Sequence, residues 1–414
     1  MSIALSARAA PHSPIFERAD RLSSIGVSEI LRVGANVAAL RREGRSVVSL
    51  CAGEPDFDTP ESIKEAARRA IAAGATKYTA LDGSDKLKEA VREKFRRENG
   101  LDYRLDEISC GAGVKQVLFN ALAATLDSGD EVVVPTPGWT SYRDMIAICG
   151  GRAVSAHCSR SDRFKLTAHA LDRAITRRTR WLLLNSPSNP CGSVYSEEDI
   201  RALAEILRAH PRVWIASDDI YEHILYDDRR FATMAAVASD LAERTLTLNG
   251  VSKTYAMTGW RIGFGAGPRT LVEAMAVVQS QTTSCPSSIS QAAAVEALTG
   301  PQDCIRQFAT AFQSRRDRFT EAIRDISGLS CDLPEGAFYL YADCEKLLGR
   351  TTPLGERIES DADFCRYLLE NGVAVVPGSC FGGAGSFRLS FAASEDEIAE
   401  GLRRIGNACR RLSA

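Results

Sequence analysis

A single lysine among small residues is the most informative chemical feature of this chain. Residues 249–263 read NGVSKTYAMTGWRIG, with Lys253 in the first part and Arg261 eight positions further on. Burying an ammonium group is costly, so an inward-facing lysine there needs a chemical role. A lysine can form a Schiff base with an aldehyde, and an arginine offers a fork of donors for a phosphate. An aldehyde and a phosphate together describe pyridoxal 5′-phosphate, whereas an exposed loop lysine is the alternative interpretation.

Two residues near the end of a predicted strand could serve the same cofactor. Asp218 ends the strand 213–218, and Tyr221 follows three positions later. A carboxylate at a pyridine nitrogen keeps that nitrogen protonated and makes the ring an electron sink. Tyr221 can donate a hydrogen bond to the 3-oxygen of the ring. We prefer Asp218 to Asp219 because it is nearer the strand end, although two adjacent acids also mark ordinary helix N-termini.

Three further segments carry groups that suit a flat, phosphorylated ligand. Asn189, in LNSPSNPCG, has an amide that can donate to a phenolate oxygen, and Trp139, in PTPGWTSY, can stack on a ring. The turn 111–116, GAGVKQ, opens a helix whose backbone N–H groups can converge on an anion. Gln116 stands where a dinucleotide fingerprint requires glycine. Each segment alone is equally compatible with an ordinary turn or a packing aromatic.

Arg388 lies inside an apolar stretch, FRLSF at 387–391. A lone arginine inside a strand needs a partner, and the α-carboxylate of a substrate would supply two acceptors. An internal salt bridge is the alternative.

The elements around these residues alternate between strands and helices. Predicted strands cover 131–135, 181–185, 213–218 and 244–250, and predicted helices cover 61–74, 84–98 and 197–210. This order is typical of a three-layer α/β/α domain with a mainly parallel sheet. In such domains ligands bind beyond the carboxyl ends of the strands, where the polar residues named above fall.

The pattern changes near residue 300, which predicts a second, smaller α+β domain. Its predicted elements are a helix at 302–327, a strand at 336–344, a helix at 361–371, strands at 372–378 and 387–392, and a helix from 394. We expect residues 1–50 to form an N-terminal arm and part of the small domain. Residues 51–300 then form the large cofactor-binding domain and residues 301–414 the small one, with an exposed loop at 347–360.

Composition excludes several other classes of protein. The 414 residues carry a net charge of −2 at a pI of about 6.3, so no basic surface for nucleic acid or anionic lipid is expected. The 12 cysteines form no C-x-x-C pair and no zinc spacing, which predicts no metal site and favours a reducing cytoplasm. The first 15 residues are too weak for a secretory signal, and no apolar run is long enough for a membrane span.

Taken together, the motifs resemble the fold-type I, class I/II aminotransferases that depend on pyridoxal 5′-phosphate, and especially the bacterial aspartate and prephenate branch. The likeness covers nearly the whole chain. It is carried by AGEPDFDTP, KYTALDG, NSPSNPCG, SDDIYE, NGVSKTYAMTGWRIG, GVAVVPG and FRLSFA.

The resemblance implies a role for each cofactor residue. Lys253 matches the family's Schiff-base lysine, which also carries the transferred proton. The other cofactor positions implied are Asp218 at the pyridine nitrogen, Asn189 and Tyr221 at the 3-oxygen, Trp139 stacked on the ring, and Arg261 with the backbone of Gly113, Val114 and Lys115 at the phosphate.

It also implies the substrate and subunit contacts. Arg388 and the backbone at Gly53 match the clamp on the substrate α-carboxylate, with Trp139 and Asn189 beside it. Tyr78 matches the tyrosine that reaches the phosphate of a neighbouring subunit, so a homodimer is expected.

The sequence departs from the family pattern where the substrate side chain is recognised. Relatives that accept aspartate have a basic residue where this chain has Ala147, and a serine–x–threonine pair where it has Ser28 and Ile30. Losing a cation that pairs with the distal carboxylate favours a neutral, aromatic or basic amino donor. Smaller departures are Gly250, in place of a hydroxyl residue that binds phosphate, and Cys191 in the turn after Asn189.

We therefore predict a transaminase that moves an amino group between an L-amino acid and a 2-oxo acid. A lyase or an amino-acid oxidase on the same scaffold is the alternative, because the same carbanion serves all three reactions. A regulator that senses the cofactor is expected to carry a DNA-binding segment, for which the first 20 residues leave no room.

Overall fold

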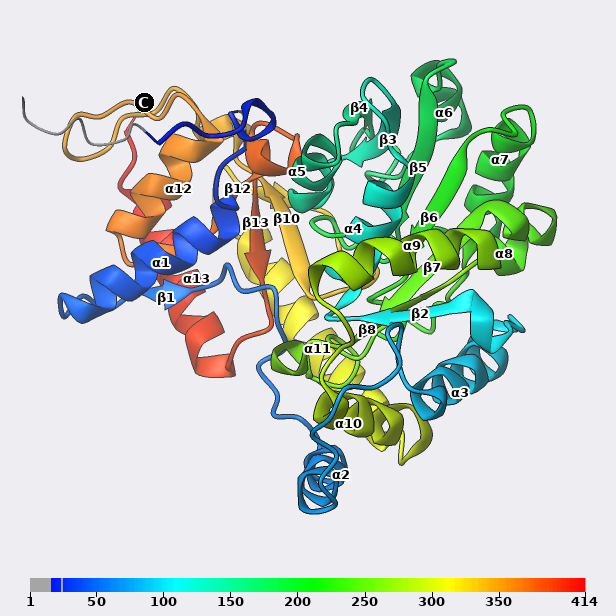
Figure 1. Ribbon diagram of the computed structural model, residues 1–414. Coiled ribbons are helices and arrows are strands. Elements are labelled where there is room, and N and C mark those ends of the chain that lie inside the picture. Colours follow the sequence, from blue (N-terminus) through cyan, green and yellow to red (C-terminus); the bar gives the residue numbers. More distant parts are fainter. Residues whose placement is uncertain (1–15, 24, 414) are drawn as a thin grey trace, which may run out of the picture.

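The computed structural model describes residues 16–23 and 25–413, so the first 15 residues, where we expect no secretory signal, lie outside the described part. Its largest element is a seven-stranded sheet in the order β2-β8-β7-β6-β5-β3-β4 (Figure 1). The strands are β2 (Ile108–Gly111), β3 (Glu131–Thr136), β4 (Arg152–His157), β5 (Thr179–Asn185), β6 (Trp214–Asp218), β7 (Thr245–Gly250) and β8 (Gly263–Ala266).

This sheet is mainly parallel. The pairs of neighbours from β4 through β3, β5 and β6 to β7 all run parallel, and only β8 pairs antiparallel with both of its neighbours. The predicted architecture of a mainly parallel sheet with flanking helices is confirmed. Because both faces of the sheet are covered, β5 reads as an unbroken apolar run rather than an alternating one.

Helices cover the two faces in separate groups. Leu182 and Leu184 of β5 pack with α6 (Ala168–Ala174), α7 (Glu197–Arg208) and α8 (Met234–Val237). Leu183, which points the other way, packs with α4 (Val114–Thr125), α5 (Ser141–Ile148) and α9 (Arg269–Thr282). The remaining helices of this part are α2 (Glu61–Ala72), α3 (Asp85–Lys94) and α10 (Ser288–Thr299).

Local signals in the sequence explain why these helices form where they do. In α7 the Ser196 side chain accepts from the backbone N–H of Asp199, whose carboxylate accepts in return from the Ser196 N–H. This reciprocal cap satisfies two free donors at the start of the helix. Apolar residues at helical spacing then face the sheet: Ile200, Leu203, Ala204 and Leu207 are buried.

A second, smaller unit is built from the C-terminal part of the chain together with N-terminal segments. Its four-stranded sheet has the order β12-β13-β10-β9, and β1 pairs in parallel with β11. The blue α1 of Figure 1 packs on this unit, because its Val33 and Val37 share a core cluster with Val376 of β12. The strands are β1 (Val48–Ser49), β9 (Ser330–Cys331), β10 (Tyr339–Asp343), β11 (Val373–Ala374), β12 (Val376–Pro377) and β13 (Ser386–Ser390), and the helices are α1 (Glu29–Arg42), α11 (Asp303–Arg324), α12 (Asp361–Glu370) and α13 (Glu395–Arg410).

The division at residues 50 and 300 stays a prediction. Strand β1 lies just before the first of these boundaries and pairs with β11 of the smaller unit. Among the described helices, none combines the length and the apolar character needed to cross a lipid bilayer.

Candidate active site

A cavity of about 700 Å³ lies at the carboxyl ends of the central strands, between the two units of the molecule. Most of the residues singled out in the sequence line it. They are Gly53, Val114, Lys115, Trp139, Asn189, Asp218, Tyr221, Lys253, Arg261 and Arg388. The large sheet supplies Asp218 from β6 and Lys253 from the segment after β7, and the smaller unit supplies Arg388 from β13.

Lys253 is held in the cavity by a single hydrogen bond. Its Nζ donates to the Gly53 carbonyl oxygen at 2.6 Å. Burial lowers the pKa of Lys253 to about 8, and the guanidinium groups of Arg261 and Arg388 act in the same direction. The neutral, nucleophilic amine is therefore far more available near neutral pH than for an exposed lysine.

Asp218 presents one free carboxylate oxygen to the cavity. Its Oδ2 accepts from the Tyr142 hydroxyl at 2.5 Å, while its Oδ1 is buried without a hydrogen-bond partner. Burial raises the pKa of Asp218 to about 6. Asp219 faces elsewhere, because its carboxylate accepts from the hydroxyls of Ser217 and Thr233. Of the two adjacent acids, only Asp218 lines the cavity.

Arg388 is completely buried and has no acidic partner. It donates to Asn189 Oδ1 at 3.0 Å and to the Cys51 carbonyl oxygen at 2.7 Å, and its Nε has no partner. No carboxylate in the described part of the chain lies within 4 Å of its guanidinium group, so the internal salt bridge considered above is absent there. A buried cation of this kind is suited to an incoming carboxylate.

Arg261 reaches the N-terminus of α4. Its Nη2 donates to the Ala112 carbonyl oxygen at 3.2 Å, and its Nη1 to that of Thr258 at 2.8 Å. Gly113, at the start of the helix, has a φ of +92°, and a Cβ there would lie 2.3 Å from Arg261 Nη2. Only glycine allows the guanidinium group this close to the helix end, where a cation and free N–H groups suit a phosphate.

The side chain of Lys115 enters the cavity, which the sequence analysis did not foresee. Its Nζ donates to Ser141 Oγ at 3.1 Å and lies 4.7 Å from the centroid of the Trp139 ring. Burial and the nearby Arg261 lower its pKa. The sequence showed Lys115 only as part of a glycine turn, but a lysine in the first turn of a helix at an anion site was itself a signal.

Two tyrosines were also missed. Tyr142 holds Asp218, and the Tyr339 hydroxyl lies 2.8 Å from that of Tyr221. Both line the cavity. Tyr142 stands three residues after Trp139 in a segment already singled out, whereas Tyr339 comes from β10, far away in the chain, and no local pattern connects it to Tyr221.

The remaining predicted positions divide between the cavity wall and the outside of the cavity. Ala147 is a correction: it is in the last turn of α5 and does not line the cavity, which that helix reaches only through Ser141 and Tyr142. Ser28 and Ile30 do line it. Tyr78 is 90% exposed and away from the cavity of its own chain.

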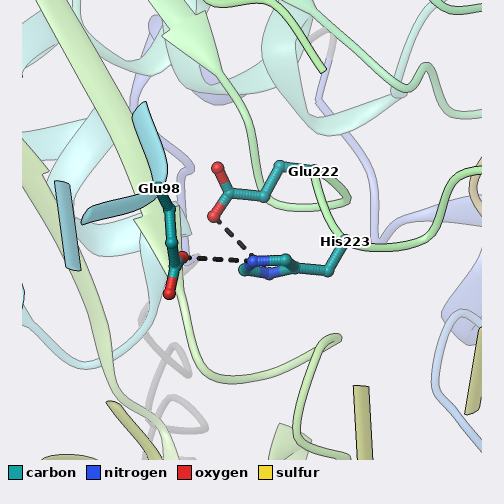
Figure 2. Close-up of side chains that lie close together, drawn as sticks. All are labelled: Glu98, Glu222 and His223. Carbon is teal, nitrogen blue, oxygen red and sulfur yellow. Dashed lines mark ion pairs between the residues drawn. The ribbon is translucent and has the colours of Figure 1, made fainter. Parts of the chain in front are cut away.

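A buried charge cluster lies next to the lysine segment. Figure 2 shows His223 between the carboxylates of Glu98 and Glu222, with ion-pair distances of 3.1 and 3.6 Å. The ammonium group of Lys94 also contacts Glu222. His223 Nδ1 lies 3.2 Å from the hydroxyl of Thr254, the residue after Lys253, so this cluster supports the segment that carries the lysine.

The sequence profile of the family described as aminotransferase class I and II matches residues 45–405. The chain belongs to that family. It is a pyridoxal-phosphate-dependent aminotransferase that uses an amino acid and a 2-oxo acid, as the sequence predicted, and the lyase or oxidase alternative is not favoured.

Individual relatives agree with this assignment. The aspartate aminotransferase of Rhizobium meliloti strain 1021 is 60% identical over 96% of this chain and 97% of its own. A crystal structure of the aspartate aminotransferase from Rhizobium meliloti matches with a TM-score of 0.94, over 96% of this chain and 100% of that one. The aspartate/prephenate aminotransferase of Cereibacter sphaeroides is 49% identical over 95% of this chain and 99% of its own.

A more distant structure carries a ligand. The aspartate aminotransferase of Thermus thermophilus, solved with maleate, is 42% identical over 95% of this chain and 100% of its own, with a TM-score of 0.88.

The cavity of this aminotransferase fits the cofactor of its family. The unpartnered Asp218 Oδ1 suits a protonated pyridine nitrogen, and Lys253 offers an amine to an aldehyde. The Arg261 guanidinium group lies against the start of α4, in the space that a Cβ at Gly113 would otherwise fill. The pyridine nitrogen, the aldehyde and the phosphate of pyridoxal 5′-phosphate thus each have a fitting group in the cavity.

Proposed function

We propose that this aminotransferase takes a dicarboxylic amino acid, L-aspartate, as its donor. The observation that carries the proposal is the ammonium group of Lys115 inside the cavity. Arg388 provides a cation for the α-carboxylate, and Lys115 provides a second cation for the distal carboxylate. The names of the relatives and the maleate bound by the Thermus thermophilus enzyme, a dicarboxylate, support the same donor class.

This proposal reverses the expectation of a donor without a second carboxylate. That expectation depended on the missing basic residue at Ala147, which does not line the cavity. The cation comes instead from α4, close to the ring of Trp139. Lys115 is exposed at the cavity, and no carboxylate in the described part of the chain lies within 4 Å of its ammonium group, so that group is free to pair with an anionic substrate group.

The roles of the cofactor residues are part of the proposal. When bound, pyridoxal 5′-phosphate supplies an electron sink for the carbanion at the substrate Cα. Lys253 supplies the amine that the aldehyde needs and afterwards carries the proton from Cα. The remaining groups hold the cofactor: Asp218 the pyridine nitrogen, Tyr221 and Asn189 the 3-oxygen, Trp139 the ring face, and Arg261 with the backbone of Gly113, Val114 and Lys115 the phosphate.

The contacts of these residues support the proposed roles. Tyr142 donates to one oxygen of Asp218 and leaves the other for the pyridine nitrogen. Asn189 accepts from Arg388 through Oδ1, which leaves its NH₂ group to donate. Substrate carboxylate binding at Arg388 and donation by Asn189 are therefore linked through one hydrogen bond. Lys253 Nζ donates to the Gly53 carbonyl, so the lysine nitrogen lies beside the backbone proposed to bind the substrate α-carboxylate.

The active unit is a homodimer in this proposal. Tyr78 is 90% exposed and does not line the cavity of its own chain, as expected for a side chain that contacts the phosphate of a partner subunit. Ile71 and Val277 are further exposed apolar residues that such a contact could cover. All 12 cysteines are free, which favours a cytoplasmic location.

Prephenate is a second candidate for the 2-oxo acid, since relatives carry aspartate/prephenate names. Prephenate has two carboxylates and a ring. The wall that α1 contributes to the cavity contains Ile30 and Leu31 with the small residues Gly34 and Ala35, which suits a bulky apolar group. Transamination of prephenate at a rate comparable to that of oxaloacetate, with L-glutamate as donor, would support this acceptor.

Substitution of Lys115 tests the donor. Lys115→Met should lower kcat/KM for L-aspartate by about 10- to 100-fold, because a charged hydrogen bond is lost, and leave L-alanine nearly unchanged. Lys115→Arg retains the charge and is the matched control. An equal loss for both donors would mean that Lys115 does not recognise the distal carboxylate.

A further inference from the structure

Tyr339 connects two parts of the active site that come from different units of the molecule. It lies on β10 of the smaller unit, is fully buried and lines the cavity. Its hydroxyl oxygen is 2.8 Å from that of Tyr221, which follows β6 of the large sheet. Its ring lies under the guanidinium group of Arg388, with the Arg388 Cζ 4.4 Å from the ring centroid.

The direction of the hydrogen bond between the two hydroxyls follows from the proposed role of Tyr221, on which this inference rests. A hydroxyl has one proton. If Tyr221 donates its proton to the 3-oxygen of the cofactor, it can only accept from Tyr339. The Tyr339 hydroxyl then donates its hydrogen bond to the Tyr221 oxygen. This bond polarises the Tyr221 hydroxyl, so that Tyr221 donates more strongly to the 3-oxygen.

The surroundings of Tyr339 leave its hydroxyl few other choices. A Cβ at Gly53 would lie 3.3 Å from the Tyr339 hydroxyl oxygen, so the chain around Gly53 covers it on that side. The Arg388 guanidinium group lies over the ring and is a donor without acceptor capacity. Tyr221 is therefore the hydrogen-bond partner of the Tyr339 hydroxyl.

We propose that Tyr339 is a positioning residue with two separable contributions to the reaction. Its hydroxyl aims the Tyr221 proton at the 3-oxygen of the cofactor, and its ring face supports Arg388 as the α-carboxylate clamp. Tyr339 acts in each case through another residue.

Tyrosine-to-phenylalanine variants separate the hydroxyl from the ring. The readout is the pH midpoint of the visible absorption change of the cofactor-loaded protein without substrate. Tyr221→Phe should raise this midpoint, because the oxygen left without a donor binds the proton on the Lys253 nitrogen more tightly. Tyr339→Phe should raise it by a smaller amount, about 0.4 to 1 pH unit, from the weakening of one hydrogen bond.

The double variant shows whether Tyr339 acts through Tyr221. Adding Tyr339→Phe to Tyr221→Phe should leave the midpoint where Tyr221→Phe alone puts it. Tyr341→Phe is the control, since it removes a hydroxyl two residues along the same strand that donates to the Gly383 carbonyl, outside the cavity. It should not move the midpoint. Additive shifts in the double variant, or no shift with Tyr339→Phe alone, would overturn the contribution of the hydroxyl.

The ring is tested by the affinity of the cofactor-loaded protein for succinate, which has no amino group and cannot turn over. Tyr339→Leu should weaken succinate binding by about 3- to 30-fold, whereas Tyr339→Phe, which keeps the ring, should bind it nearly as the unaltered protein does. Equal affinities of the Leu and Phe variants would overturn the contribution of the ring.

These outcomes are distinct from failure of the proposed function. If Tyr221→Phe itself leaves the midpoint unchanged, the proposed role of Tyr221 is wrong, and the hydroxyl inference falls with it. If Tyr221→Phe moves the midpoint and Tyr339→Phe does not, only the inference on Tyr339 fails.

Discussion

At the scale of single residues, the chemistry of this aminotransferase depends on charged groups that the fold buries without full compensation. Lys253, Arg388 and the free oxygen of Asp218 all face one cavity. Such groups reduce stability and are retained where they bind or react.

The pKa of Lys253 is the basis of one prediction. Because this pKa is lowered from 10.5 to about 8, the neutral amine forms over a lower pH range than for an ordinary amine. The rate at which the cofactor-free protein captures pyridoxal 5′-phosphate, divided by the rate for a simple alkyl amine, should therefore be highest below pH 8 and fall between pH 8 and 10.5. Stopped-flow absorbance measures both rates, and a ratio that does not change with pH would contradict the lowered pKa.

Residue types alone were sufficient to identify much of this site. Lys253 and Arg388 were singled out because a charge in an apolar setting needs a reason. Asp218 was chosen because it ends a strand, and Arg261 because it follows the lysine by eight positions. All four line the cavity. The partner of a residue could not be found in the same way. Tyr339 meets Tyr221 only because β10 and the end of β6 are brought together by the fold, and no spacing along the chain encodes that contact.

Among the secondary-structure elements, the strands of the large sheet differ in how clearly the sequence marks them. The longer strands were predictable from apolar runs such as WLLLN, which extend as β5 over Thr179–Asn185. We missed β8 (Gly263–Ala266), whose sequence GFGA lacks the β-branched residues that mark a strand. We also missed β4 (Arg152–His157), which lies at the edge of the sheet and is only partly buried.

The start of α4 gives a prediction with a matched control. Gly113→Ala places a Cβ 2.3 Å from Arg261 Nη2 at a φ of +92°, so it should displace the guanidinium group and weaken cofactor binding. A loss of at least about tenfold in affinity follows from the lost charged contact of Arg261 with the phosphate, about 1.5–3 kcal/mol. Gly129→Ala has a similar φ of +90° with no atom nearby, and should leave affinity unchanged in a fluorescence titration. Equal effects of the two variants would argue against a phosphate role for Arg261.

The charge cluster of Figure 2 gives a prediction about stability. Burial opposes the ionisation of Glu98, but His223 and Lys94 outweigh it and lower the Glu98 pKa to about 2. Lys94→Met leaves the buried Glu222 and the partly buried Glu98 short of a cation, so urea denaturation should show a loss of about 3–5 kcal/mol in the free energy of unfolding. Arg201→Met, which breaks an exposed pair with Glu197, should change it little. Similar values for the two variants would mean that the cluster is not a source of stability.

At the scale of the whole molecule, the cavity lies where two units meet, and each supplies part of the chemistry. The large sheet provides Lys253 and Asp218, and the smaller unit provides Arg388 and Tyr339. The mainly parallel large sheet was predictable from the alternation of strands and helices. The pairing of β1 with β11, which joins residues more than 300 positions apart, depends on the assembled core and left no periodic signal.

The proposed dimer can be tested by mixing two defective subunits. Tyr78→Phe should weaken cofactor binding in a homodimer, and Lys253→Ala should abolish the visible absorption band of the bound cofactor. In a hybrid of the two, one site combines an intact Lys253 with an intact Tyr78 from the other subunit. Half of the sites should then regain the affinity of the unaltered protein in an absorbance titration. A hybrid without such recovery would mean that Tyr78 does not serve a neighbouring site.

The most direct test of the central claim is one half of the reaction with a single donor. The protein loaded with pyridoxal 5′-phosphate is mixed with L-aspartate or L-alanine and no 2-oxo acid, and the released cofactor and the oxo acid are identified by mass spectrometry. We predict one equivalent of pyridoxamine 5′-phosphate and one of oxaloacetate per active site. The reaction with L-aspartate should be about 100-fold or more faster than that with L-alanine, as expected when a second charged contact is made. Faster reaction with L-alanine, or cofactor that stays in the aldehyde form with L-aspartate, would contradict the account.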